Sequence, residues 1–133
     1  MNKIEHIGIA VKNLETSNLV FEKIFGAPPY KTEVVESEGV STSFFMNGPN
    51  KIELLEATNL DSPIAKFLEK KGEGIHHIAF DVDDILSEIA RLKSEGFTVL
   101  NETPKKGADN KLVAFLHPKT TNGVLIELCQ EIK

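Results

Sequence analysis

The stretch His6-Ile7-Gly8-Ile9-Ala10-Val11 decides the fold, because it recurs in the second half of the chain as His77-Ile78-Ala79-Phe80-Asp81-Val82. A second motif recurs with it: Lys51-Ile52-Glu53-Leu54 has its counterpart in Leu125-Ile126-Glu127-Leu128. Each half therefore opens on a strand that carries a His and closes on a strand that carries a Glu. The repeat predicts two copies of one module in tandem.

Each half has the pattern of a βαβββ module. Apolar residues alternate with small or polar ones in the strands, and the helices end at glycine. The expected elements are strands at 3–11, 30–36, 40–47 and 50–57 with a helix at 15–25, then strands at 75–82, 97–102, 111–117 and 123–130 with a helix at 84–95. On the first helix we expect an apolar side of Leu19, Val20, Ile24 and Phe25.

The predicted fold class is α+β, with the two modules forming a curved eight-stranded mixed sheet that carries its helices on the outer face. We expect a single domain over 1–133. Module one covers about 1–58, a linker helix about 62–72 and module two about 74–131. The linker helix is expected to start at Asp61-Ser62-Pro63, where an Asp or Ser cap precedes a proline.

Strand parity brings the His and Glu residues of the repeat onto one face. Alternate residues of a strand point to opposite sides, so His6 faces away from the helices if Ile7 and Ile9 face them. The same parity applies to three further residues: Glu53, His77 and Glu127. Two imidazoles and two carboxylates on one open face are a ligand set for one divalent metal ion, and Co, Mn, Ni or Zn would each accept it.

Each of these residues taken singly has a plainer explanation. A His near a strand start is usually a hydrogen-bonded structural residue, and a Glu in a strand usually faces solvent. Recurrence at matching positions favours the ligand interpretation. His76 has the opposite parity to His77, and His117 precedes Pro118 in a turn, so neither is expected to bind metal. Cys129, in an apolar strand, is expected to be a buried structural thiol.

The composition fits one soluble globular domain and excludes several partners. The chain has 133 residues, of which 41% are apolar and 26% charged. Its formal charge of −5 argues against nucleic acid or an anionic membrane as a partner. There is no signal peptide or membrane-length apolar run, and one Cys cannot form an internal disulfide, so we expect a cytoplasmic location.

These motifs resemble the vicinal oxygen chelate (glyoxalase/bleomycin resistance/dioxygenase) superfamily and, within it, the methylmalonyl-CoA epimerase family. The resemblance covers nearly the whole chain. Besides the repeated motifs it is carried by Asp61-Ser62-Pro63-Ile64-Ala65-Lys66-Phe67-Leu68 and by Phe115-Leu116-His117-Pro118-Lys119. It implies metal ligation by His6, Glu53, His77 and Glu127. It also implies a homodimer.

The resemblance further implies a metal-dependent epimerase that interconverts the 2R and 2S forms of methylmalonyl-CoA. A proton α to the thioester would be removed, through a metal-stabilised enolate, and returned on the other face. Glu127 and Glu53 are the expected catalytic carboxylates. Some members carry a catalytic carboxylate two residues after a Gly-Val pair, where this chain has Thr42. The acidic segment of Glu36 and Glu38 is therefore a second candidate source of a base.

An acyl-CoA substrate needs cations for its phosphates. Four lysines lie on loops beside the closing strands, and they are also the kind of residue that serves only solubility. We expect the phosphates to contact chiefly Lys111 and Lys119, with Lys105 and Lys106 as further candidates.

Two other functions share this fold. A glyoxalase I-like lactoylglutathione lyase uses the same metal site and chemistry, but would need Arg side chains for the glutathione carboxylates. The chain has a single Arg, Arg91, on a predicted helix. A non-enzymatic drug-binding protein commonly lacks the metal ligands, whereas all four positions are filled here. The epimerase is therefore favoured.

Overall fold

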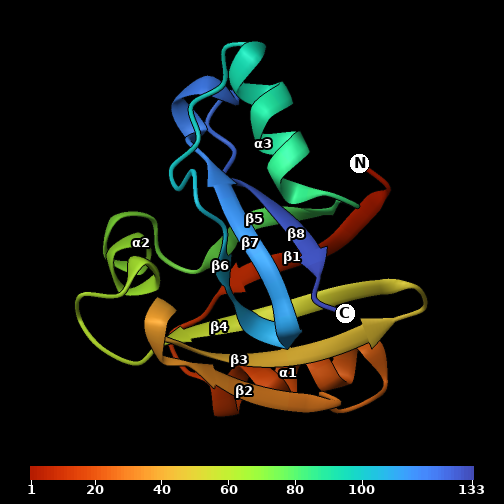
Figure 1. Ribbon diagram of the computed structural model, residues 1–133. Coiled ribbons are helices and arrows are strands. Elements are labelled where there is room, and N and C mark those ends of the chain that lie inside the picture. The colour runs from red at the N-terminus through yellow and green to blue at the C-terminus, as the bar shows by residue number, and fades with distance from the viewer. The chain divides into compact units, whose positions relative to one another are not determined.

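A computed structural model describes residues 1–133 as three α-helices and eight strands joined by short loops and 3-10 turns (Figure 1). The strands are β1 (Lys3–Ala10), β2 (Lys31–Val35), β3 (Val40–Asn47), β4 (Asn50–Ala57), β5 (Gly74–Asp81), β6 (Lys105–Lys106), β7 (Lys111–Leu116) and β8 (Ile126–Glu131). The helices are α1 (Leu14–Phe25), α2 (Pro63–Lys71) and α3 (Ile85–Ser94). None of these helices is both long and apolar enough to cross a bilayer.

The strand order is β2-β3-β4-β1-β5-β8-β7-β6, which makes one eight-stranded mixed sheet. Strand β1 pairs in parallel with β4, and β5 pairs in parallel with β8, while the hairpin pairs are antiparallel. The order β2-β3-β4-β1 of the first half is thus repeated by β6-β7-β8-β5 in the second. The α+β class and the two βαβββ modules predicted from the repeat are confirmed.

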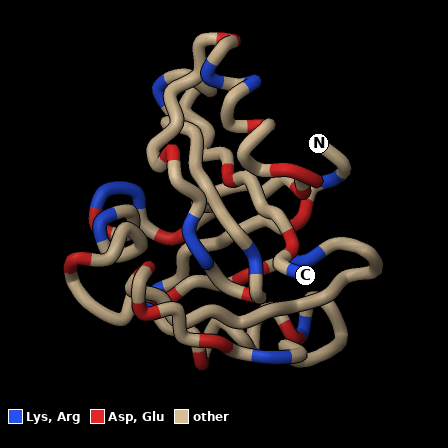
Figure 2. Tube along the Cα trace, viewed as in Figure 1, with Lys and Arg blue, Asp and Glu red and all other residues tan.

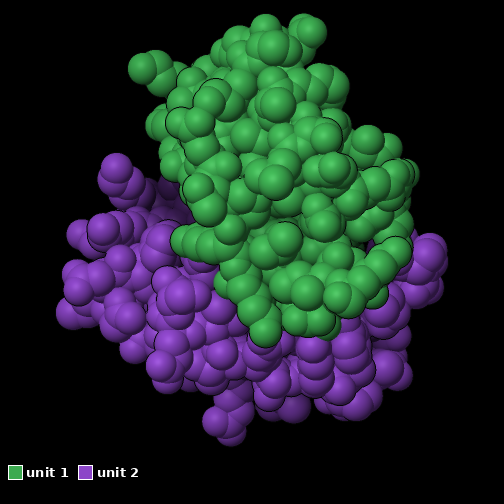
Figure 3. Space-filling model, viewed as in Figure 1, with its two compact units in different colours: residues 1–5, 77–133 green, residues 6–76 purple.

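The chain divides into two compact units (Figure 3). One unit consists of residues 6–76, and the other of residues 1–5 and 77–133. Each unit contains the His and the Glu of one repeat: residues 6–76 include His6 and Glu53, and residues 77–133 include His77 and Glu127. Each unit therefore holds one complete pair of the candidate His and Glu residues.

The core of unit 6–76 lies between α1 and the sheet. Val11, Phe45 and Leu54 are buried there, and Phe21 and Phe25 of α1 pack against them. The phenyl rings of Phe21 and Phe25 lie 6.3 and 5.6 Å from that of Phe45, measured between centroids. Helix α1 begins at Asn13, whose side chain accepts from the amide of Thr16, and ends at Gly26 in the left-handed conformation.

The expected apolar side of α1 was partly wrong. Phe25 faces the sheet as predicted, but Leu19, Val20 and Ile24 are each more than half exposed. The helix is rotated so that Phe21 meets the sheet together with Phe25. Aromatic rings bury more apolar area than aliphatic side chains, and tilted ring pairs add to that gain. The exposed aliphatic residues form a separate apolar row on the outside of the unit.

The core of the other unit lies under α3. Ile85, Ile89 and Leu92 are buried against the sheet, as their spacing predicts, and Asp84 caps the helix by accepting from the amide of Ser87. The linker helix α2 is likewise capped by Ser62, which accepts from the amide of Ile64. These caps explain why the helix boundaries could be predicted from sequence to within a residue or two.

The predicted strand at 97–102 is wrong. Only Val99 makes an isolated bridge, to Leu116, and the edge strand is instead β6 at Lys105–Lys106. The side chain of Asn101 explains the difference. Its Oδ1 accepts from the amide of Phe115 at 3.0 Å, and its Nδ2 donates to the carbonyl of Val113 at 3.2 Å. A side-chain amide thereby supplies bonds that a strand backbone would otherwise make.

Candidate active site

His6 and Glu53 form a buried pair in unit 6–76. Nδ1 of His6 lies 3.2 Å from Oε2 of Glu53, and each side chain is only 5% exposed. The pairing of β1 with β4 sets this contact, because Gly8 is the register partner of Glu53 and His6 precedes Gly8 by two residues. The glycine leaves room on the face that both side chains share.

His77 and Glu127 form the matching pair in the other unit. Nε2 of His77 lies 3.1 Å from Oε1 of Glu127, and the side chains are 6% and 7% exposed. The imidazole meets the ring of Phe115 edge-on at 6.0 Å between centroids. The second carboxylate oxygen of Glu127 accepts a hydrogen bond of 2.7 Å from the thiol of Cys129.

Both pairs fit the coordination of a divalent metal ion. Imidazole nitrogen and carboxylate oxygen are donors that Zn, Co, Mn and Ni accept. An ion held at about 2.0–2.2 Å by two adjacent ligands keeps their donor atoms roughly 3 Å apart, and the His–Glu separations in the two units are 3.2 and 3.1 Å. Each unit therefore offers two correctly spaced donors from a buried, small-residue face.

Thr42 lies on the same face of unit 6–76 as Glu53. In the pairing of β3 with β4 it stands opposite Leu55, two residues beyond Glu53. Its side chain is fully buried, and its hydroxyl has no hydrogen-bond partner. The next residue, Ser43, has an equally buried and unpartnered hydroxyl but points to the other face of the sheet. A threonine hydroxyl can bind a ligand but is no general base at neutral pH.

The acidic segment Glu36–Glu38 forms a 3-10 turn between β2 and β3. Glu36 is exposed and Glu38 is half-buried. The segment thus differs from Glu53, whose carboxylate is buried beside a His.

Figure 2 shows the Lys and Arg positions of the chain in blue. The candidate CoA-binding lysines fall into two places within their unit. Lys105 and Lys106 make up β6, and Lys111 begins the paired strand β7, so these three cations share one end of the β6–β7 hairpin. Lys119 lies in the 3-10 turn Pro118–Thr120 that follows the other end of β7. The hairpin therefore gathers three of the four predicted lysines and leaves Lys119 apart.

His76 and His117 have local roles. The ring of His76 meets that of Phe67 on α2 edge-on, at 5.0 Å between centroids. Nδ1 of His117 accepts from the amide of Lys119 at 3.0 Å and so caps the 3-10 turn. The turn role predicted for His117 is confirmed.

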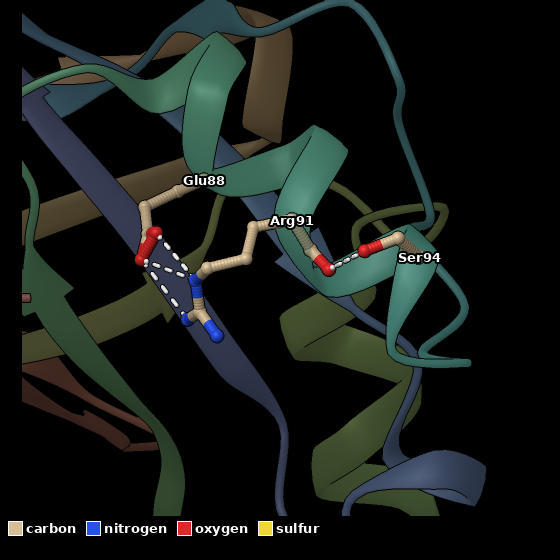
Figure 4. A network of polar contacts seen from close by, with 3 residues as sticks. All are labelled: Glu88, Arg91 and Ser94. Atoms are coloured by element: carbon tan, nitrogen blue, oxygen red, sulfur yellow. Dashed lines mark hydrogen bonds and ion pairs between the residues drawn. The ribbon is translucent and has the colours of Figure 1, made fainter.

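Arg91 is engaged on the surface of α3 (Figure 4). Its Nε and Nη2 donate to the carboxylate of Glu88 over 3.0–3.2 Å, and Ser94 donates to the Arg91 carbonyl at 2.7 Å. The hydrogen bond from the guanidinium lowers the pKa of Glu88 and raises that of Arg91. A glutathione-binding lyase would need an arginine to bind the substrate carboxylates. The guanidinium of Arg91 is already paired with Glu88 on its own helix.

Two polar residues of the site faces were missed in the sequence. Lys51 is buried on β4, and Cys129 donates to Glu127 on β8. A signal for both was present: Lys51 lies two residues before Glu53, and Cys129 two residues after Glu127. Equal parity places each on the face of its neighbouring Glu.

Comparison with known proteins agrees with this geometry. Residues 5–115 match the profile of the Glyoxalase/Bleomycin resistance protein/Dioxygenase superfamily. The chain is 42% identical to the ethylmalonyl-CoA/methylmalonyl-CoA epimerase of Cereibacter sphaeroides, over 98% of each protein. It is 40% identical to an uncharacterised protein of Bacillus subtilis, over 98% of this chain and 93% of that one.

Solved structures of such enzymes share the fold. The Streptomyces coelicolor methylmalonyl-CoA epimerase in complex with 2-nitronate-propionyl-CoA superimposes with a TM-score of 0.94. That enzyme is 35% identical, and the match covers 100% of this chain and 99% of the other. The chain therefore belongs to the glyoxalase/bleomycin resistance protein/dioxygenase superfamily and, within it, to the methylmalonyl-CoA epimerase family.

Proposed function

We propose that this protein is a metal-dependent methylmalonyl-CoA epimerase that interconverts the 2R and 2S thioesters. The observation that carries the proposal is the buried His–Glu pair in each unit, found in a chain whose relatives include epimerases of this substrate. The lactoylglutathione lyase alternative lacks comparable support, because Arg91 is bound by Glu88 on α3.

The proposed metal ligands are His6, Glu53, His77 and Glu127, acting together on one divalent ion within a single domain. Their donor types would accept Co, Mn, Ni or Zn. When bound, the ion would supply Lewis-acid stabilisation for the negative charge that develops on the thioester oxygen. The hydrogen bond from Cys129 would keep the Glu127 carboxylate in one orientation.

Glu127 and Glu53 are the proposed acid and base. One carboxylate takes the proton from the α-carbon while the electrons of the C–H bond pass into the enolate. The other carboxylic acid returns a proton to the opposite face, which inverts the centre and restores the C–H bond. The two residues occupy equivalent places in the repeat, so each is proposed to serve one face of the substrate.

The CoA moiety is proposed to bind near the β6–β7 hairpin. Lys105, Lys106 and Lys111 gather there, and their charges suit the phosphates of CoA. Lys119, at the other end of β7, is the remaining candidate contact. Single variants that replace each lysine by Met test these contacts, because loss of a phosphate contact should weaken CoA binding.

We also propose a homodimer located in the cytoplasm. Leu19, Val20 and Ile24 form an exposed apolar row on α1, a kind of surface that a second subunit commonly covers. The buried thiol of Cys129, which is in no disulfide, suits a reducing compartment. Sedimentation of the protein and of its Ile24→Glu variant tests the dimer, which the added charge is expected to weaken if this row is the interface.

The decisive experiment is proton exchange of methylmalonyl-CoA in deuterated water, followed by NMR. Protein purified without chelator is expected to carry a divalent metal, to exchange the α-proton and to convert either enantiomer. Chelation should abolish exchange, and metal should restore it. The absence of exchange in metal-loaded protein, or turnover of a glutathione hemithioacetal instead, would contradict the proposal.

The neighbouring histidines provide a matched control. His77→Ala removes a proposed ligand, whereas His76→Ala removes a ring that packs against Phe67 on the linker helix. Only the first variant is expected to lose bound metal. Equal metal content in both folded variants would remove His77 from the ligand set.

A further inference from the structure

Lys51 is a buried cation on the face that carries Glu53. The residue is only 6% exposed, although lysine is rarely buried in proteins. In the pairing of β1 with β4 its register partner is His6, and Glu53 follows it by two residues. Lys51 therefore shares its sheet face with both members of the first His–Glu pair.

The ammonium group of Lys51 lies near Phe44, the residue paired with Glu53 on the adjacent strand. Its Nζ lies 5.9 Å from the centroid of the Phe44 ring, and Phe44 stands directly opposite Glu53 in the pairing of β3 with β4. The ring is fully buried. A cation beside a buried ring is poorly screened by water, so it attracts an anion more strongly than a surface lysine does.

A second lysine on the same ring provides a contrast. Nζ of Lys31 lies 4.7 Å from the centroid of Phe44. Its side chain is 38% exposed and pairs with Glu33 at 3.6 Å along β2, the strand at the end of the sheet order. The two lysines thus share an aromatic neighbour but differ in burial, and Lys31 is the natural control.

We propose that Lys51 recognises the free carboxylate of a malonyl-type thioester. This inference rests on the proposed function for the class of substrate. Burying that carboxylate is unfavourable unless a cation meets it. Lys51 is buried on the face that carries His6 and Glu53, so its ammonium group can meet that carboxylate within the proposed site. Propionyl-CoA, which has the same acyl chain without the carboxylate, gains nothing from this residue.

Binding of two thioesters tests the inference without turnover. Malonyl-CoA carries the carboxylate and propionyl-CoA does not, and calorimetry with the metal-loaded full chain measures each affinity. We expect the natural protein to prefer malonyl-CoA. Lys51→Met keeps the apolar stem and removes the charge. It should weaken malonyl-CoA binding by about 10- to 100-fold, the range for a hydrogen bond to a charged group, and leave propionyl-CoA binding nearly unchanged.

The control and the fold are checked in parallel. Lys31→Met should preserve the preference for malonyl-CoA, and metal analysis and thermal unfolding should show that Lys51→Met is folded and loaded. If Lys51→Met does not fold, Lys51→Gln replaces it, and NMR of 13C-labelled lysine in the natural protein gives a reading free of any variant. The Lys51 signal should then shift with malonyl-CoA and not with propionyl-CoA.

The outcomes separate this inference from the proposed function. A folded Lys51→Met variant that still prefers malonyl-CoA, or an unmoved Lys51 signal, overturns the role of Lys51 even if the protein epimerises its substrate. If the preference depends on Lys51 but methylmalonyl-CoA exchanges no proton, the carboxylate recognition stands and the proposed reaction fails.

Discussion

The thiol of Cys129 donates a hydrogen bond of 2.7 Å to Oε2 of Glu127, and both side chains are buried. The other oxygen of the same carboxylate lies 3.1 Å from Nε2 of His77. Glu127 is therefore held at both oxygens, by His77 on the neighbouring strand β5 and by Cys129 on its own strand β8. Hydrogen bonds behind a metal ligand fix its orientation and commonly change metal affinity when they are removed.

Replacing Cys129 by Ala is expected to weaken metal binding by about tenfold or more, because the Glu127 carboxylate loses the donor that orients it. Cys129→Ser keeps a donor at a similar place and should retain most of the affinity. Metal titration of chelator-treated protein measures both. Equal affinities in the Ala and Ser variants would mean that the thiol serves packing alone.

Much of the fold and both His–Glu pairs could be predicted from the repeat. Parity along a strand is fixed by backbone geometry, so the faces of His6, Glu53, His77 and Glu127 followed from the positions of their apolar neighbours. The boundaries of α2 and α3 followed from local capping by Ser62 and Asp84, which depends only on residues close in sequence.

The failures share a different cause. The rotation of α1 depends on Phe45, far along the chain, whose ring selects Phe21 over the aliphatic residues. The loss of the strand at 97–102 depends on Asn101, whose side chain bonds to the backbone of β7. The orientation of α1 and the conformation of 97–102 are both set by contacts between residues far apart in the sequence. A single sequence carries no direct signal for such contacts. Lys51 was missed for another reason, because a lysine in a strand usually faces solvent.

Glu127→Gln and Glu53→Gln test the assignment of two bases. Each variant removes a proton acceptor but keeps a ligand oxygen, so bound metal is expected to remain. Epimerisation should fall by about 10²-fold or more in either variant. Proton exchange into deuterated water should be lost chiefly from one enantiomer in Glu127→Gln and from the other in Glu53→Gln. NMR with the separate 2R and 2S thioesters makes this measurement.

Two results would contradict the assignment of Glu127 and Glu53 as the two bases. If Glu127→Gln exchanges the α-proton of both enantiomers at the full rate, Glu127 is no base. If both variants lose the same enantiomer, the two glutamates act on one face of the substrate and another residue must serve the second.

Glu88 should give a small pH-dependent contribution to stability. Arg91 lowers the pKa of this carboxyl in the folded state. Its contribution is therefore present above the ordinary carboxyl pKa and is lost as the pH falls through the lowered value. Glu88→Gln should be slightly less stable than the natural protein near neutral pH, and the difference should vanish in acid. Urea unfolding at several pH values measures it.

Ser94→Ala is the control for this pair, because Ser94 donates to the backbone carbonyl of Arg91 and has no carboxylate partner there. Its effect on stability should not change with pH. A pH-independent difference for Glu88→Gln would show that the ion pair contributes nothing and that the substitution acts through the helix itself.

Thr42→Val and Ser43→Ala separate substrate binding from folding. Both residues bury a hydroxyl without a partner, so removing either should leave the protein as stable or more stable, by about 1 kcal/mol.

Only Thr42 lies on the face of Glu53, whereas Ser43 points to the other side of the sheet. If substrate supplies the missing partner of Thr42, Thr42→Val should lose activity while Ser43→Ala retains it. Thermal unfolding and proton exchange measure the two effects. Equal activity in both variants would show that the Thr42 hydroxyl makes no contact with substrate and is only an unsatisfied group of the core.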